Sequence, residues 1–358
     1  MALSTEHKLY IGIGIALALG GAFYLQSLQN KKEAASYSAE AAVADLPKLE
    51  ITEDTTKEIT KIELNSPGDP DADKDEDKKP LKIVLEKDGK GDDAKWKLTS
   101  PLKAKANDAN VKSLLGNLEK LSVSDRIASG TETYDKYEVS DKKALHAVFF
   151  KGGDKIADLY LGSSGSRGEM TRFAGKDGVY ALQGYSQFLY KRDLRGWRDR
   201  EIFKFDEKKA KTVKLDNETG SFEFTKDGGT WKGTLDGKSI KDFDPKKLEN
   251  MLRTFKGLNA DNFGDDKKPA DVGLDDPVAT LTIILDDDAK RVLYVGANAE
   301  GEARWAKKAG SDLIFSITSW AANWTTAETE KFQEKKEEDK DKNDAVTPPP
   351  VDLPGDDD

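Results

Sequence analysis

The chain has 358 residues, of which 35% are charged, 37% are hydrophobic and none is cysteine, and its formal net charge is −10. The absence of cysteine excludes disulfides, thiolate metal sites and cysteine nucleophiles, and two histidines, His7 and His146, nearly exclude a multi-histidine metal centre. The negative balance argues against a nucleic-acid partner, whose phosphates require a basic face, and the length suffices for two ordinary domains.

The first predicted element is an apolar segment near the start of the chain, Leu9–Leu25, whose seventeen residues carry no charge. As a helix rising about 1.5 Å per residue, it would span about 25 Å, near the lower limit for crossing a bilayer. Tyr10 and Tyr24 lie near its ends, where aromatic residues anchor such helices at the membrane interface. We therefore expect a transmembrane signal anchor over residues 9–28 that contacts inner-membrane lipid, with residues 1–8 in the cytoplasm.

A cleaved signal peptide is the alternative for this segment. The small-x-small pattern of a cleavage site occurs at Ala42-Val43-Ala44, which is too far beyond Leu25, the end of the apolar run. A linker rich in alanine and acidic residues, 29–55, follows the apolar segment. We expect the apolar segment to stay attached to the mature protein.

Two amphipathic helices are predicted in the body of the chain. The first covers about residues 110–121 with Asp108 as its N-cap, and the second follows Asp244 as N-cap with Pro245 in its first turn. Both place apolar residues at i, i+3, i+4, i+7 and i+10, which forms one apolar stripe on a helix. The stripes consist of Val111, Leu114, Leu115, Leu118 and Leu121 in the first helix and of Leu248, Met251, Leu252, Phe255 and Leu258 in the second.

Other landmarks recur at nearly the same separation along the chain as the two helices. Trp96 precedes the first helix much as Trp231 precedes the second, and Leu159–Gly162 follows the first as Leu293–Gly296 follows the second. Several matches in one order at a nearly constant separation indicate a duplication. The predicted units are repeat 1, residues 56–205, and repeat 2, residues 206–328.

Strand patterns surround each helix. Apolar and charged residues alternate through residues 81–86, and Phe222 and Phe224 alternate similarly. Asp-Gly pairs, which are hairpin signals, occur at 88–89, 177–178 and 227–228. Further paired strands are predicted at residues 147–150, 157–161, 281–285 and 291–295. The predicted fold class is α+β, with an N-terminal single transmembrane helix followed by two repeated units, each an antiparallel sheet with one packed amphipathic helix.

Charged low-complexity sequence interrupts and follows the repeats. Ser66–Pro80 is an acidic insertion between two strands of repeat 1, and residues 329–358 form an acidic tail that contains Pro348–Pro350. Segments of this composition bury too little apolar surface to fold. We expect the tail to be disordered.

Several segments of the repeats carry a family resemblance. Trp96–Leu102 (WKLTSPL) precedes the first helix, and Val272–Pro277 (VGLDDP) follows the second; Leu159–Gly162, Val179-Tyr180 and Leu194–Phe203 (LRGWRDREIF) complete the set. Through them the sequence resembles the domain of unknown function 4340 family of bacterial envelope proteins, once per copy, over about residues 57–325.

The two copies depart from the family pattern at different places. Repeat 2 lacks the Ser-Pro pair in its WKGTLDGKSI segment, and repeat 1 has Tyr137-Glu138-Val139 where repeat 2 has Val272-Gly273-Leu274. The resemblance implies an N-terminal membrane anchor, domains outside the cytoplasm and association with ABC-transporter components of the gliding-motility type, and it brings no catalytic residues. Together with the apolar segment, it leads us to expect a single-pass inner-membrane protein whose C-terminal domains face the periplasm.

Three motifs are candidates for a metal or phosphate site, and each is better explained as a loop. The acidic run from Asp69 to Asp77 resembles the start of a calcium loop, but Lys74 and Pro80 occupy the positions that require glycine and glutamate. Asp286–Asp288 lies at a predicted hairpin tip. Gly162–Gly168 (GSSGSRG) lacks the Gly-Lys-Ser/Thr of a phosphate-binding loop.

The remaining candidates have structural interpretations that we favour. The most basic cluster could meet anionic lipid or an acidic partner, but acidic neighbours largely cancel its charge. His146 lies on a predicted strand with no evident nucleophile nearby, and Trp96 and Trp231 are expected to cover the core beneath each helix. The basic cluster consists of Arg192, Arg195, Arg198 and Arg200 with Trp197, and its acidic neighbours are Asp193, Asp199 and Glu201.

The sequence thus predicts no catalytic residue, no cofactor-binding residue and no metal ligand. The leading hypothesis is a membrane-anchored, non-enzymatic envelope protein that presents two α+β domains as binding surface, as an accessory of an ABC-transporter or motility-type envelope assembly. The alternatives are an envelope acid/base hydrolase that uses paired carboxylates, because carboxylates are abundant, and a solute- or glycan-binding module.

Overall fold

A computed structural model describes residues 24–28, 30, 46–68, 78–89 and 94–334. The chain divides into two units, Met1–Asp199 and Arg200–Asp358. We call them unit 1 and unit 2 and describe each by itself.

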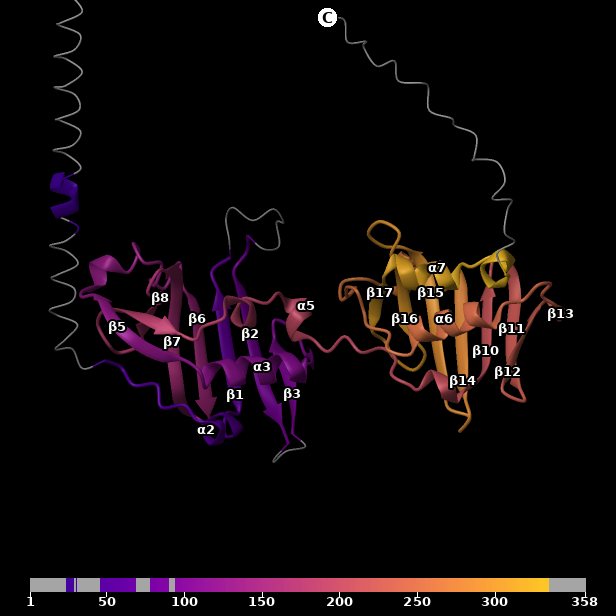
Figure 1. The fold of residues 1–358 in the computed structure, drawn as a ribbon, viewed down its shortest axis with the longest axis horizontal. Coiled ribbons are helices and arrows are strands. Elements are labelled where there is room, and N and C mark those ends of the chain that lie inside the picture. Colours follow the sequence, from indigo (N-terminus) through magenta and orange to yellow (C-terminus); the bar gives the residue numbers. More distant parts are fainter. Residues whose placement is uncertain (1–23, 29, 31–45, 69–77, 90–93, 335–358) are drawn as a thin grey trace, which may run out of the picture. The chain divides into compact units, whose positions relative to one another are not determined.

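Unit 1 is built on an antiparallel sheet of nine strands in the order β4-β3-β2-β1-β6-β7-β8-β9-β5. Figure 1 shows the strands β3, β2, β1, β6, β7 and β8 of this sheet. Successive side chains of a strand point to opposite faces, so Ile62 and Leu64 of β1 enter the core while Glu63 points to the other face. The strands are β1 (Lys61–Ser66), β2 (Leu81–Asp88), β3 (Lys95–Ser100), β4 (Ala104–Lys105), β5 (Ser122–Ala128), β6 (Leu145–Lys151), β7 (Asp154–Gly165), β8 (Gly168–Phe173) and β9 (Val179–Gln183).

Helix α3 (Asp108–Leu118) packs on the inner face of this sheet. It begins after Asn107, whose side chain accepts a hydrogen bond from the Asn110 backbone N–H at 3.1 Å. The expected N-cap, Asp108, is instead the first helical residue, and its carboxylate accepts the Trp96 backbone N–H at 2.9 Å. Shorter helical elements are α2 (Glu53–Lys57), η1 (Thr131–Thr133), α4 (Gln187–Tyr190) and α5 (Leu194–Trp197).

The core of unit 1 lies between α3 and the inner face of the sheet. Val111, Leu114 and Leu118 of the helix are completely buried against strand residues, and Leu115 is partly buried. The apolar stripe predicted for this helix is therefore confirmed as a core face. Trp197 is also completely buried in this cluster.

Unit 2 has an antiparallel sheet of eight strands in the order β13-β12-β11-β10-β14-β15-β16-β17. The phenylalanines expected to alternate, Phe222 and Phe224 of β11, are both completely buried. The strands are β10 (Ala210–Asn217), β11 (Gly220–Asp227), β12 (Thr230–Leu235), β13 (Lys238–Ser239), β14 (Ala279–Leu285), β15 (Lys290–Asn298), β16 (Arg304–Lys308) and β17 (Ile314–Ile317).

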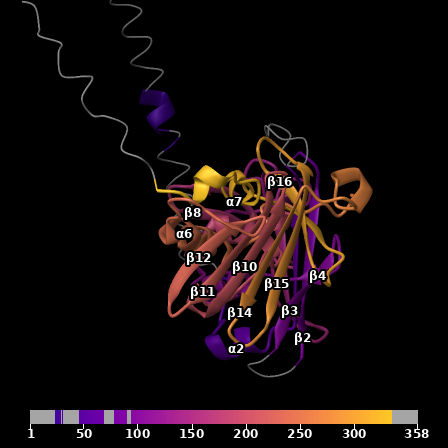
Figure 2. The same ribbon diagram turned by 90° about the vertical axis from the view of Figure 1, so that its right-hand side faces the viewer.

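Helix α6 (Pro245–Phe255) lies with α7 (Ser319–Thr325) on one face of this sheet (Figure 2). The predicted N-cap is confirmed, because the Asp244 carboxylate accepts the Lys246 backbone N–H at 2.9 Å. All five residues of the predicted stripe, including Leu248 and Leu252, are buried in one cluster with the strands. The remaining elements are η2 (Glu207–Lys209), η3 (Pro269–Val272) and η4 (Thr329–Phe332).

The two sheets repeat one topology. In unit 1 the neighbouring strands run β4-β3-β2-β1-β6-β7-β8-β9, and in unit 2 they run β13-β12-β11-β10-β14-β15-β16-β17. Each strand of the first series therefore has a counterpart at the same position in the second. A glycine is required at the same point of both units. A Cβ at Gly162 would lie 2.3 Å from the Tyr137 carbonyl oxygen, and one at Gly296 would lie 2.1 Å from the Val272 carbonyl oxygen. The duplication predicted from spacing thus has a structural counterpart.

The predicted fold class is wrong. We expected α+β units with one packed helix each, but the described residues are dominated by two large antiparallel sheets of nine and eight strands, and the longest helices between strands, α3 and α6, have 11 residues. Edge strands such as β4 and β13 contain two residues each and carry no alternation pattern. The sequence pattern therefore predicted fewer strands than the sheets contain.

The expected transmembrane helix is not supported either. None of the helices in the described residues has the length and apolar character needed to cross a bilayer. Residues 9–23 of the expected segment lie outside the described residues, and residues 24–28 contribute five helical residues. At the other end, η4 belongs to unit 2 because Phe332 is completely buried in its core, and residues 335–358 of the expected tail lie outside the described residues.

Candidate functional site

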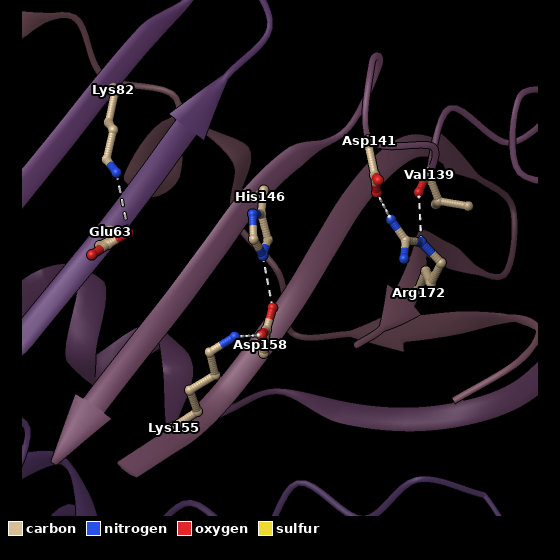
Figure 3. A network of polar contacts seen from close by, with 8 residues as sticks. All are labelled: Glu63, Lys82, Val139, Asp141, His146, Lys155, Asp158 and Arg172. Carbon is tan, nitrogen blue, oxygen red and sulfur yellow. Dashed lines mark hydrogen bonds and ion pairs between the residues drawn. The ribbon is translucent and has the colours of Figure 1, made fainter. Parts of the chain in front are cut away.

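The outer face of the unit 1 sheet, opposite α3, carries a network of polar side chains (Figure 3). The strands β2, β1, β6, β7 and β8 are consecutive in the sheet, and the residues between their core positions point outward together. We call this set the polar face of unit 1. It consists of Glu63, Lys82, His146, Lys155, Asp158, Tyr160 and Arg172.

Asp158 of β7 lies at the centre of the polar face. Its carboxylate accepts hydrogen bonds from the Lys155 ammonium at 2.6 Å and pairs with Nε2 of His146 at 2.7 Å. Both partners point at the one carboxylate (Figure 3). Burial of Asp158 would by itself raise its pKa, but the hydrogen bonds from Lys155 and His146 outweigh burial, and the pKa is lowered. The carboxylate is therefore held as an anion.

Tyr160 is held between side chains from the strands on either side. The His146 ring, on β6, stacks on it with centroids 4.0 Å apart and planes 6° from parallel. The Arg172 guanidinium, on β8, lies 3.5 Å from the centroid of the same ring. These contacts combine aromatic stacking with a cation–π interaction and fix the phenol ring in one orientation.

Arg172 also fastens an external segment to the sheet. Its Nε donates to the Val139 carbonyl oxygen at 2.9 Å, its Nη2 pairs with the Asp141 carboxylate, and its guanidinium lies 5.0 Å from the Tyr134 ring centroid. Val139 is completely buried in a small cluster with residues of β8 and β9. The segment that contains Val139 and Asp141 therefore borders the polar face as a fixed rim.

Glu63 of β1 forms the opposite side of the network. It pairs with Lys61 at 2.9 Å and with Lys82 at 3.4 Å. The hydrogen bond from Lys61 is the main cause that lowers the pKa of Glu63, with Lys82 adding to it. Lys82 and Lys155 keep more than half of their side-chain surface exposed and are the accessible cations of the face.

Unit 2 has the same scaffold with different chemistry at these positions. Tyr160 on β7 corresponds to Tyr294 on β15, and the residues that pair with them from the preceding strand are His146 and Thr280. The stacked imidazole of unit 1 is thus a threonine in unit 2. The fold itself does not require the histidine.

The other two central residues differ in the same way. Asp158 lies two residues before Tyr160, and Val292 lies two residues before the corresponding tyrosine. Arg172, which pairs with Tyr160, corresponds to Lys307. The anion and its histidine partner therefore belong to unit 1 alone, although both units fold without disturbance of the sheet.

The arrangement orders charges rather than exposing a reactive group. Imidazole and carboxylate are two components of a hydrolytic triad, but here their hydrogen bonds go to each other and to Lys155. Within the described residues, no group of three or more His, Cys, Asp or Glu side chains could hold a metal ion. A flat aromatic stack surrounded by fixed charges of both signs suits recognition of a partner surface.

The motifs singled out in the sequence lie elsewhere. The acidic run from 69 to 77 falls outside the described residues. The Asp286–Asp288 turn joins β14 to β15, with the Asp287 side chain accepting the Ala289 backbone N–H at 3.0 Å and Asp288 pairing with Lys211. Gly162–Gly168 belongs to the hairpin between β7 and β8.

The basic cluster near residue 195 is partly internal. Trp197 and Arg198 are buried, and the Arg192 guanidinium lies 5.9 Å from the Trp197 ring centroid. Trp96 and Trp231 are buried in the cores of their units, as expected. His146 is the one candidate that the structure places in the polar face.

Sequence reasoning missed the partners of His146. Asp158 and Tyr160 lie on the next strand and meet His146 only through the register of β6 and β7. Tyr160 was recognised within Leu159–Gly162 as a marker of the repeat rather than as part of a site. Comparison of the two copies position by position would have shown that His146 and Asp158 are not shared.

A second residue that sequence reasoning missed is Glu169 of β8, a buried carboxylic acid. It accepts a hydrogen bond from the Ser164 hydroxyl at 2.5 Å. Burial is the main cause that raises its pKa. Because Ser164 is its hydrogen-bonding partner in the same hairpin, the pair fixes the tip of the β7–β8 connection.

Comparison with known proteins gives one match. The sequence profile of the family described as "Domain of unknown function (DUF4340)" matches residues 96–277. No curated protein and no solved structure matches the chain.

Proposed function

We propose that this chain, which belongs to the DUF4340 family, is a non-enzymatic envelope protein that acts outside the cytoplasm and binds a partner protein through the polar face of unit 1. The observation that carries the proposal is the difference between the units. His146 and Asp158 form a fixed pair at positions where the same scaffold in unit 2 has Thr280 and Val292.

The composition of the polar face supports a protein partner. Lys82 and Lys155 are accessible, whereas Glu63 and Asp158 are largely covered and orient them. Ordered charges around an aromatic stack provide electrostatic complementarity at low cost in side-chain entropy. The resemblance to envelope proteins supports an accessory role in an ABC-transporter or motility-type assembly, and the partner is then a component of that assembly.

We further propose that both units are copies of the family domain. The shared pairing order and the equivalent close approaches at Gly162 and Gly296 support this. The family profile matches once, across residues 96–277, and so includes parts of both units.

Photocrosslinking tests the binding surface. A photoreactive amino acid placed at Lys82 or Lys155 should crosslink to one discrete protein in native envelopes, because both side chains are 55% exposed on the polar face. The control is Lys214 on the outer face of unit 2, which is 46% exposed and should give no such product. Equal crosslinking from both units, or none from unit 1, would contradict the proposal.

The location has its own test. The chain has no cysteine, so Gly153→Cys introduces a single thiol at an exposed turn where a Cβ meets no heavy atom within 4 Å. A membrane-impermeant maleimide should label it in intact spheroplasts. Protection until the cells are lysed would place unit 1 in the cytoplasm and overturn the assignment.

A further inference from the structure

A cleft in unit 2 lies far along the chain from the polar face and has a different chemistry. Its volume is about 220 Å³, and it is bordered by η2, the β11–β12 hairpin and α6. Trp231 and Leu252 form its apolar base, and both are buried in the core of unit 2. Its other lining residues are charged.

The charges of the cleft do not balance. Glu207 is already neutralised by Lys256 at 2.8 Å, and that hydrogen bond is the main cause that lowers the pKa of Glu207. Lys208, Lys226 and Arg253 then face Glu249 alone.

The cations are also available to a ligand. In the described part of the chain, Lys208 and Arg253 form no ion pair. A guanidinium and an ammonium without ion pairs therefore give this cleft a local positive charge in a chain of net charge −10.

Lys226 is held in position over the base of the cleft. Its ammonium lies 5.5 Å from the Trp231 ring centroid and donates to the Lys208 carbonyl oxygen at 3.5 Å. A cation fixed in this way loses little further entropy when it meets an anion. The cleft therefore combines two cations that form no ion pair with one that is already oriented.

Unit 1 shows which of these features the fold requires. Its counterpart of Lys226 is Lys87, which pairs with Trp96 across the strands and donates to the Lys57 carbonyl oxygen at 2.9 Å. However, α3 has Gly116 at the position of Arg253, because Leu115 corresponds to Leu252. The lysine and tryptophan are common to both units, whereas the guanidinium is particular to unit 2.

We propose that this cleft binds a small solute through a carboxylate or phosphate group. Arg253 supplies a planar donor pair that matches either group, and Lys208 and Lys226 supply point charges. The volume is below the roughly 300–1,000 Å³ of pockets for drug-sized ligands, so the solute is a small one. This site is independent of the partner-binding function assigned to unit 1.

The test uses the full chain labelled with ¹⁵N at the tryptophan indoles, with the Trp231 signal assigned by Trp231→Phe. Sodium phosphate and sodium glucuronate are titrated separately against sodium chloride at equal ionic strength. We expect a saturable shift of the Trp231 indole signal with at least one of the two anions, and none with chloride. A shift with phosphate alone identifies a phosphate ligand, and a shift with glucuronate alone identifies a carboxylate ligand.

Variants identify the binding residue. Arg253→Gln should weaken binding of the anion at least tenfold, and Lys208→Gln should also weaken it. Arg291→Gln on β15, outside the cleft, should bind as the parent does. An equal shift with chloride, the absence of a saturable shift with either anion, or unchanged binding in both cleft variants would overturn the proposal.

Discussion

The ring of His146 stacks on the ring of Tyr160 at 4.0 Å, while Nε2 of the same histidine pairs with Asp158 at 2.7 Å. One side chain thus joins the aromatic and the charged parts of the polar face. Tyr160 and Asp158 both belong to β7, so one histidine on β6 contacts the side chains of both.

Asp158→Asn should destabilise unit 1 at neutral pH by about 1–2 kcal/mol, because it removes the charged acceptor of Lys155 and His146. The folded-state pKa of Asp158 is below its ordinary value of 3.8. Its stabilising contribution is therefore present above pH 3.8 and is lost as the pH falls through the folded pKa. The free energy of unfolding of the variant and of the parent, measured with urea, should differ less at pH 3 than at pH 7. A difference that stays constant with pH would argue against the charge effect.

Glu169→Gln should stabilise unit 1 at neutral pH, which is the opposite of the effect expected for Asp158→Asn. The pKa of Glu169 is raised above 4.5 in the folded protein, so the native state holds this proton more tightly than the unfolded chain does. Ionisation therefore costs stability as the pH rises from about 4.5 through the folded pKa. Glutamine keeps an acceptor for Ser164 and carries no charge. Thermal melts should show the variant equal to the parent near pH 4 and more stable at pH 7–8.

Gly116→Ala should stabilise unit 1 by about 0.5–1 kcal/mol, because glycine inside a helix costs conformational entropy. A Cβ at this position of α3 meets no heavy atom within 4 Å. The matched control is Gly162→Ala, whose Cβ would lie 2.3 Å from the Tyr137 carbonyl oxygen and should destabilise the same unit. Chemical denaturation of both variants checks the pair. A destabilising effect at Gly116 would show that the helix packs differently.

Leu114→Asp and Leu248→Asp should each unfold one unit. Both side chains are completely buried, one in the core of each unit, and an unpaired buried carboxylate costs several kcal/mol, which is comparable with the stability of a domain. Hydrogen exchange followed by mass spectrometry should show lost protection in the mutated unit and retained protection in the other. Intact protection with lost partner binding would identify the helix stripe as a binding surface instead.

The sequence was sufficient for features that depend on local periodicity. The stripes on α3 and α6, the Asp244 N-cap and the hairpin turns all follow from short-range rules. The extent of the sheets did not follow, because two-residue strands such as β4 gain their place only from pairing with a neighbour. The left-handed Glu138, φ 59°, stands where unit 2 has Gly273, φ 68°, so the copies share a backbone shape that their residues conceal.

The candidate site was less predictable than the fold. His146 was noticed as a single histidine on a strand, but its partners Asp158 and Tyr160 lie on the next strand and meet it only through the register of the sheet. A pairing register is a tertiary property that period-2 patterns do not specify on the solvent face. The departures between the two copies therefore contained more information about the site than any motif did.

We propose that the polar face of unit 1 binds a partner through residues that unit 2 lacks. The most direct measurement replaces them by their unit 2 counterparts, His146→Thr, Asp158→Val and Arg172→Lys, and quantifies the partner crosslinked from Lys82 in native envelopes. Thr280→Val on the outer face of unit 2 is the control. We predict that the triple variant remains folded, as hydrogen exchange in its core strands will show, and loses the crosslink, while the control retains it. A triple variant that folds and still crosslinks to the same partner at the parental level would show that these residues do not carry the binding.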